Sequence, residues 1–366
     1  GGATLSHTHA NYYSTNTLQR GDAWERAVSV ELLDAARTEN AQVNCGVQIS
    51  GGASRNPQQT SKHSLRLVFK SHFGPSVWSY RFFPDTRLAA FDDIVLRAGF
   101  NDSWTARARN LHLPGQYVRD RFIRGLQRAM GVDCGSSRFV HLYLNALYWG
   151  VYDATSMPDA QYAAHRFGGS ESDYDSIYPV SDSAEQVDIE SGTWDAFTSM
   201  FALVNAGVTS AAQYAALQAY LDVPRFADYM ILNHWAMNAD WPRGNWRLLR
   251  ERPRAGRFVY HCWDAEWTVA TNQPNWFPQR GDLRYVINGL GSDNDPTFAW
   301  CPGRLFWRLF GCAEFRLLYA DRVQRWCGRP HALLQADAVA RYATLAGELD
   351  RAIVAETIGE SSFMVW

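Results

Sequence analysis

Alternating apolar and polar positions predict a β-rich first part of the chain. Residues 27–33 alternate as a strand, and residues 44–50 repeat the pattern and are expected to pair with them. A further strand is expected over residues 63–69. Residues 138–145 and 148–152 indicate a β-hairpin that closes this sheet, with an aromatic end.

A helical spacing follows the first strands. Over residues 116–130, apolar side chains recur four positions apart, at Val118, Phe122, Leu126 and Met130. Arg119 falls inside this apolar arc, where a guanidinium requires a carboxylate or phosphate partner. A structural ion pair and a ligand contact both satisfy that requirement.

Helical patterns dominate from about residue 158 onward. Helices are predicted over residues 194–206, 211–221 and 224–238, and two or more between residues 305 and 358. The prediction is an α+β protein of two lobes, with a β-rich lobe over residues 24–152 and a mainly helical lobe over residues 153–366. Residues 1–23, rich in Ser, Thr, Asn and His, are predicted to form an N-terminal extension.

Composition narrows the class of protein. Hydrophobic residues make up 46% of the chain and the net charge is −2, which is typical of a soluble globular protein. Nucleic acid is therefore not an expected partner. The nearly apolar run over residues 139–152 is shorter than the ~20 residues of a membrane-spanning helix, so membrane insertion is not expected either.

The six cysteines do not indicate a metal site. They are scattered, with no CxxC pair and no clustering with histidine, which argues against a structural zinc. Spacing alone leaves disulfides and buried thiols equally open. Their positions are Cys45, Cys134, Cys262, Cys301, Cys312 and Cys327.

Lysine is used sparingly. The chain has two lysines, Lys62 and Lys70, and thirty-three arginines. Lys62 directly precedes the strand over residues 63–69 and follows the turn at Gly51 and Gly52. This order of strand, glycine turn, lysine and strand is typical of a lobe that covers nucleotide phosphates, where a compact ammonium is useful.

Asp240, Asn245 and Asp264 have the spacing of a phosphoryl-transfer site. An Asp is followed five residues later by an Asn, and a second Asp follows a stretch that reads as a hairpin. In such sites the first Asp orients the acceptor hydroxyl, while the Asn and the second Asp hold the metal ion. Turn chemistry before Pro242 and a helix N-cap at Asp264 are the structural alternatives.

The chain resembles the CotH kinase family of spore-coat and bacterial surface proteins from Trp24 to about Glu356. The segments that carry the resemblance, after the Trp-Glu-Arg start at Trp24, are residues 51–55, 62–69, 96–104, 117–120, 141–145, 148–152, 238–246 and 263–267.

The resemblance implies an atypical protein-kinase-like fold. It implies binding of ATP with Mg²⁺ or Mn²⁺, and transfer of phosphate to Ser or Thr of a protein or peptide substrate. Asp240 would be catalytic, and Asn245, Asp264 and Glu266 would be metal ligands. The residues that would line the nucleotide are Lys62, Arg55, Gly51, Gly52, Ser54, Arg119, Tyr148, Trp149 and Tyr152. An extracellular, cell-envelope or spore location is expected in preference to the cytoplasm.

One position departs from the family pattern. Ser156 stands where the family has a Glu shortly before Pro-Asp, and a carboxylate there would suit a ribose hydroxyl or a cleft salt bridge. Two other functions therefore stay open: a nucleotidyl or other ATP-dependent transferase on the same fold, and a pseudokinase or surface-binding module. A metal hydrolase built on His7, His9 and acidic residues lacks any HExxH-type spacing. The histidines next to apolar or aromatic residues are expected to pack in the core; they are His141, His234 and His261.

Overall fold

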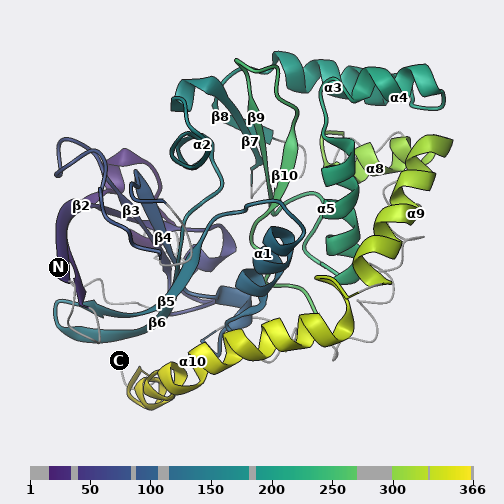
Figure 1. The fold of residues 1–366 in the computed structure, drawn as a ribbon. Helices are drawn as coiled ribbons and strands as arrows, with labels where there is room; N and C mark the ends of the chain where they lie inside the picture. Colours follow the sequence, from purple (N-terminus) through teal and green to yellow (C-terminus); the bar gives the residue numbers. More distant parts are fainter. Residues whose placement is uncertain are drawn as a thin grey trace. The chain divides into compact units, whose positions relative to one another are not determined.

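The structure is a computed structural model that describes residues 16–33, 40–83, 88–105, 115–180, 187–269, 299–328 and 330–363. The described residues fall into two compact units (Figure 1). Those within Gly1–Gly115, Ser136–Met157 and Leu349–Trp366 form the first unit. Those within Gln116–Gly135 and Pro158–Glu348 form the second. His7 and His9 lie outside the described residues.

The first unit is built on a six-stranded antiparallel sheet with the order β1-β2-β3-β4-β6-β5. The pairings confirm the strands predicted from alternation, including the hairpin at the sheet edge. β4 is the one strand of this sheet that the sequence interpretation did not name. The strands are β1 (Arg26–Leu33), β2 (Asn40–Ser50), β3 (Ser64–Val68), β4 (Asp93–Arg97), β5 (Ser137–Leu144) and β6 (Leu147–Thr155).

The register of β2 and β3 places the glycine turn and Lys62 at one end of this sheet. Ser50, the last residue of β2, pairs with Ser64, the first residue of β3. The connection between these strands therefore begins at Gly51 and ends just after Lys62. The order of strand, turn, lysine and strand read from the sequence is confirmed.

The second unit contains a four-stranded antiparallel sheet with the order β10-β9-β7-β8. The β9–β10 pair is the hairpin expected between Asn245 and Asp264. β7 was not predicted, because four consecutive residues at its start are buried and the strand has no alternation to detect. The strands are β7 (Tyr174–Pro179), β8 (Val187–Ser191), β9 (Trp246–Glu251) and β10 (Val259–Cys262).

Helices make up much of the rest of the second unit, and their predicted ends need correction. α1 begins at Arg119 because Tyr117 has a φ of 61°, which no right-handed helix accommodates. α5 ends at Trp235, before Met237 at a φ of 50°. The helices are α1 (Arg119–Ala129), α2 (Ala160–Phe167), α3 (Asp195–Ala206), α4 (Ala211–Leu217), α5 (Val223–Trp235), α8 (Pro302–Phe310), α9 (Ala313–Cys327) and α10 (Gln335–Phe363), the last of which runs on into the first unit.

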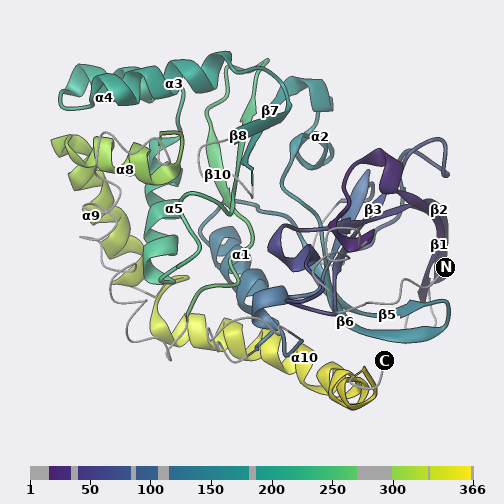
Figure 2. The same ribbon diagram turned by 180° about the vertical axis from the view of Figure 1, so that it is seen from behind.

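α5 lies at the centre of the second unit's core. It starts with Pro224 in its first turn, and the Asp222 side chain caps it by accepting a hydrogen bond from the Arg225 amide at 3.1 Å. It packs against α9 and β10, and both views show α5 beside α9 (Figures 1 and 2). Phe226 and Leu232 are fully buried there, and burial of each such side chain stabilises the fold by ~1.5–3 kcal/mol.

Two further properties bear on the sequence predictions. All six cysteines are free thiols, and each is buried except Cys327, which is partly exposed. This decides between the two alternatives left open by their spacing. Among the described residues, no helix combines the length and apolarity needed to cross a bilayer.

Candidate functional site

Asp240 and Asn245 belong to the loop that joins α5 to β9. The Asn245 side chain folds back on the start of this loop, where Nδ2 donates to the Asp240 backbone oxygen at 2.9 Å and to its Oδ2 at 3.0 Å. Asp240 is exposed and Asn245 is partly exposed. The amide nitrogen is thus engaged by Asp240, and its oxygen is the atom left to meet a cation.

The strand register brings Asn245 and Asp264 to the same end of the sheet. Trp246, the first residue of β9, pairs with Cys262, the last residue of β10. Asn245 directly precedes this pair and Asp264 follows it by two residues. Their convergence therefore follows from antiparallel pairing, in which one strand begins where its partner ends.

A second set of backbone hydrogen bonds ties the Asp240 end of the loop to the segment after Asp264. The Ala239 amide donates to the Trp267 oxygen at 2.9 Å, and the Val269 amide donates to the Ala236 oxygen at 2.8 Å. Asp240 follows Ala239 directly, so all three residues of the predicted motif are held together within the second unit.

Both candidate metal ligands have left-handed backbone conformations. The φ angle is 63° at Asn245 and 59° at Asp264. Asn and Asp enter this region more readily than other residues with a side chain, although it costs roughly 1–2 kcal/mol for an ordinary one. Conformations of this kind cluster at functional sites, where the surrounding structure holds them in place.

The donor set fits a hard cation. The carboxylates of Asp240 and Asp264 and the amide oxygen of Asn245 are the oxygen ligands that Mg²⁺ prefers, and Mg²⁺ commonly takes its remaining ligands from phosphates and water. Within the described ranges, no group of three or more His, Cys, Asp or Glu side chains could form an all-protein cage. Glu266 is buried, with 5% of its surface exposed. Its assignment as a ligand remains a prediction.

Lys62 is buried in the first unit. Its ammonium donates to the Val151 oxygen and lies 4.6 Å from the centre of the Tyr152 ring. The Tyr152 hydroxyl donates in turn to the His63 oxygen at 3.0 Å. The other lysine, Lys70, is partly exposed and bonded to carboxylates. Lys62 is thus the more buried of the two lysines, and a contact of its ammonium with phosphate remains a prediction.

The Gly51–Gly52 turn is held by Arg55. The guanidinium Nε donates to the Gly51 oxygen at 2.7 Å, and its other nitrogens donate to the backbone oxygens of Gln19 and Ile49. Gly51 has a φ of 107°, and a Cβ there would lie 2.2 Å from the Ser54 hydroxyl, so only glycine fits. These contacts give Arg55 a role in shaping the turn. A contact of this segment with phosphate remains a prediction.

The aromatic residues of β6 differ in burial. Tyr152 is fully buried, whereas Tyr148 and Trp149 are partly exposed nearer the tip of the hairpin. Tyr148 shares a 3.0 Å hydrogen bond between its hydroxyl and Nδ1 of His141. His141 is exposed, which corrects the expectation of a core histidine. Tyr148 and Trp149 are the members of this group that a ligand can reach.

Arg119 lies at the start of α1 with 1% of its surface exposed, as its place in the apolar arc predicted. The same helix carries two buried polar residues, Asp120 and Gln127, to which the sequence interpretation gave no role. Asp120 accepts a hydrogen bond from the Ala265 amide at 2.9 Å, and the Gln127 side chain bonds the backbone of β10. Their place on an amphipathic helix was a sequence signal that these side chains need partners. The sequence could not show which partners, because they lie more than 130 residues away along the chain.

His261 is a core histidine of β10. It is 4% exposed, and burial lowers its pKa to about 4. It is therefore neutral at pH 7. The expectation that it packs in the core is confirmed.

A comparison with protein families decides the classification. The family model described as CotH kinase protein matches residues 47–351. The chain belongs to the CotH kinase family. Membership of this family indicates a kinase-like phosphotransferase, and the residues of the α5–β9 loop and the segment after β10 lie within the matched range.

Other comparisons add little to the CotH assignment. No curated protein matches the chain. Among solved structures, a similar chain comes from the complex of HipA, HipB and operator DNA of the Shewanella oneidensis MR-1 toxin–antitoxin system, with 15% sequence identity and a TM-score of 0.24. The match covers 73% of this chain and 60% of that chain, so it spans less than two thirds of the other's length. A score this low carries no argument about fold or function.

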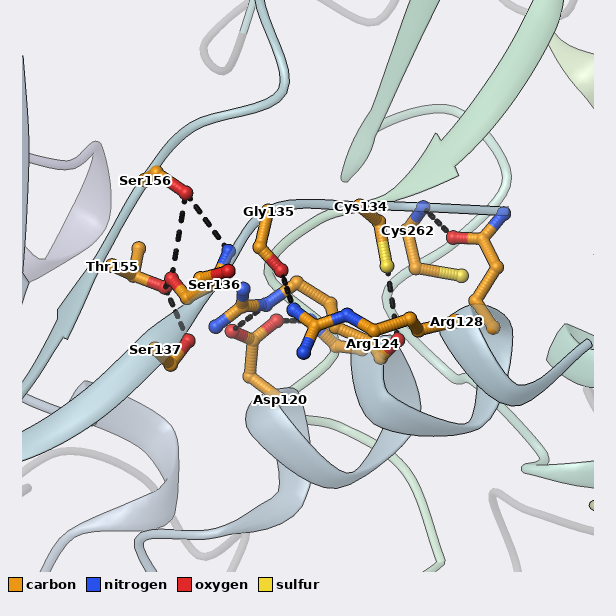
Figure 3. A network of polar contacts seen from close by, with 12 residues as sticks. Asp120, Arg124, Arg128, Cys134, Gly135, Ser136, Ser137, Thr155, Ser156 and Cys262 are labelled. Carbon is orange, nitrogen blue, oxygen red and sulfur yellow. Dashed lines mark hydrogen bonds and ion pairs between the residues drawn. The ribbon is translucent and has the colours of Figure 1, made fainter. Parts of the chain in front are cut away.

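Ser156, the position at which the resemblance implied a Glu, is buried in the first unit (Figure 3). Its hydroxyl accepts a hydrogen bond from the Ser136 amide at 2.8 Å, and its own amide donates to the Ser136 oxygen at 3.0 Å. Beside it, the hydroxyls of Thr155 and Ser137 are 2.5 Å apart. Ser156 therefore joins the end of β6 to the start of β5.

Proposed function

We propose that this protein transfers the γ-phosphate of ATP to Ser or Thr hydroxyls of a protein or peptide, with Mg²⁺ or Mn²⁺. Residues 24–152 would form the β-rich lobe of an atypical kinase-like fold and residues 153–366 the mainly helical lobe. The observation that supports this best is the convergence of Asp240, Asn245 and Asp264 at one end of the β9–β10 pair. Family membership makes phosphoryl transfer the reaction class that fits these residues.

In this proposal each residue has a distinct task. Asn245 and Asp264 hold the metal ion through their side-chain oxygens. Asp240 accepts the hydrogen bond of the incoming hydroxyl and orients it toward the phosphate. A bound divalent ion supplies charge neutralisation at the phosphate oxygens. Little covalent chemistry is asked of the protein, and positioning accounts for most of the effect.

Lys62 is the residue proposed to contact the nucleotide phosphates in the first unit. Its ammonium already lies beside a backbone oxygen and an aromatic ring in a buried position, which limits the rotamers it can adopt. The glycine turn at Gly51 and Gly52 begins the connection that ends beside it. Tyr148 and Trp149 are proposed to border the adenine.

A phosphotransfer assay tests the proposal directly. Purified protein is incubated with ATP labelled at the γ-phosphate, with Mg²⁺, Mn²⁺ or EDTA, and with a Ser- and Thr-rich peptide pool. We expect metal-dependent labelling of the peptides or of the protein itself. Asp264→Ala should abolish it, and Asp240→Asn should slow it by orders of magnitude without loss of fold. A folded Asp264→Ala variant that transfers phosphate at the parent rate would refute the assignment of Asp264 as a metal ligand.

The product and the binding step separate this function from its alternatives. Mass spectrometry of the modified peptide distinguishes phosphate from AMP or an amino acid, because these additions differ in mass. For a pseudokinase we expect ATP and Mg²⁺ to raise the melting temperature without any transfer, since ligands that bind only the native state stabilise it. The family's link to the spore coat favours a spore or cell-surface location, which immunogold labelling of intact spores and cells would test.

A further inference from the structure

We propose that Asp120 and Gln127 of α1 are positioning residues that fix the backbone on either side of Asp264 and so set the affinity of the site for its metal ion. The inference rests on the proposed function of Asp264 as a metal ligand. It concerns contacts within the second unit alone, and neither residue is required to touch metal or nucleotide.

Gln127 holds the segment before Asp264. Its Nε2 donates to the Tyr260 oxygen at 2.8 Å, and its Oε1 accepts from the Cys262 amide at 2.7 Å. β10 is the outer strand of its sheet, and Tyr260 and Cys262 are alternate residues on one side of it. One side-chain amide therefore makes the pair of hydrogen bonds that a neighbouring strand would make with β10.

Asp120 holds the segment after Asp264. Its Oδ1 accepts from the Ala265 amide at 2.9 Å, and its Oδ2 accepts from Arg124 Nε at 2.9 Å. Figure 3 shows Asp120 and Arg124 together on α1, with Cys262 near the same helix. A hydrogen bond to a carboxylate is stronger than one between two neutral groups. The contact with Arg124 therefore fixes the orientation of the buried carboxylate.

The spacing of these residues explains how one helix reaches both sides. Positions 120, 124 and 127 fall on one face of a helix, at intervals of four and three residues. All three side chains are buried, with 6%, 2% and 2% of their surface exposed. The Arg124 guanidinium also lies 5.9 Å from the centre of the Trp263 ring.

The contacts of Gln127 and Asp120 are two anchors on either side of Asp264, and the backbone between them requires this support. The Cys262 and Ala265 amides are fixed by α1, and Trp263 and Asp264 span the interval. Asp264 has a φ of 59° in that interval, a conformation that is less favourable than an extended one. Loss of either anchor lets the backbone relax, and the carboxylate then leaves the direction that suits a metal ion.

Metal binding is the measurement that tests this. Parent protein and the Asp120→Ala variant are titrated with Mn²⁺ in the presence of ATP, and free Mn²⁺ is followed by electron paramagnetic resonance. We expect Asp120→Ala to weaken Mn²⁺ binding by about 10–100-fold, the range measured for residues that orient metal ligands. Asp120→Asn keeps an oxygen for the Ala265 amide and should restore part of the affinity. It also serves if the alanine variant fails to fold.

Asp228→Ala is the matched control. Asp228 is an equally buried aspartate of the second unit, with 2% of its surface exposed, and it accepts hydrogen bonds from Arg322 and Trp326 of α9. Its loss should lower the melting temperature while the folded protein binds Mn²⁺ as the parent does. A structural role for Asp120 would produce that same result, so equal Mn²⁺ affinities in parent and Asp120→Ala overturn the inference.

The outcomes for the inference and for the proposed function are separable. Phosphate transfer by the parent, with unchanged Mn²⁺ affinity in the variant, supports the function and rejects the positioning role. Mn²⁺ binding that weakens in Asp120→Ala, without any transfer by the parent, supports the positioning role and rejects catalysis. A parent that binds no Mn²⁺ rejects both.

Discussion

Replacement of Asn245 by glycine and by alanine separates what its side chain does from what its backbone requires. Asn245→Gly removes two hydrogen bonds to Asp240, at 2.9 and 3.0 Å, but keeps access to a φ of 63°. Each bond is worth about 1 kcal/mol at most in this exposed setting. Asn245→Ala loses the same bonds and also places a Cβ without a polar side chain in the left-handed region, at a further cost of ~1 kcal/mol.

Stability and activity should therefore respond differently to the two variants. In urea unfolding, the alanine variant should be less stable than the glycine variant by about 1 kcal/mol. Both variants lack the amide oxygen that would bind the metal ion. Substitution of a residue that only supports a metal ligand typically lowers metal affinity or activity by about 10–100-fold, so both variants should show at least that loss. The assay is the transfer rate as a function of Mg²⁺ concentration, measured on protein that is folded at the assay temperature.

Asn145→Gly is the matched control for this pair. Asn145 is an exposed asparagine at the tip of the β5–β6 hairpin with a φ of 51°, so the same substitution meets the same backbone requirement. It should leave transfer and its Mg²⁺ dependence unchanged. If Asn245→Gly behaves as Asn145→Gly does, the metal role of Asn245 is refuted. If the alanine variant is as stable as the glycine variant, the strain argument fails.

Two further predictions concern Lys62 and His261. Lys62→Met should raise the ATP concentration for half-maximal rate by roughly 10–100-fold, which is the equivalent of one charge-assisted hydrogen bond of ~1.5–3 kcal/mol. Lys70→Met, at the more exposed lysine, should leave that concentration unchanged. Equal ATP dependence in the two variants would show that Lys62 does not contact the nucleotide. The pKa of His261 is lowered to about 4 in the folded protein, below its unfolded value of ~6.5. As pH falls, the unfolded state therefore binds the proton first. The free energy of unfolding then decreases as the pH falls from the unfolded pKa to the folded pKa. From pH 7 to pH 5 this histidine should account for about 2 kcal/mol of lost stability, and urea unfolding of His261→Gln should show a correspondingly shallower pH dependence.

Elements with a clear sequence period were predictable. β1, β2 and β3 alternate in polarity, and α1 repeats apolar residues every four positions, so local patterns alone place them. β7 was not predicted because its buried start has no alternation of polarity. The end of α5 was misplaced because nothing in the sequence indicates that Met237 has a left-handed backbone conformation. Local propensity is decisive only where one face of an element meets water.

By itself the sequence predicted Asp240, Asn245 and Asp264 as site residues, because their chemistry and spacing lie within one short stretch of chain. Only the tertiary structure decided that they meet. The Trp246–Cys262 pairing and the Ala239–Trp267 bond bring the three together. The supports on α1 are visible only there, since Asp120 bonds an amide 145 residues away. The spacing of residues along the chain can be read from the sequence, whereas hydrogen bonds between distant segments depend on how the chain packs its core.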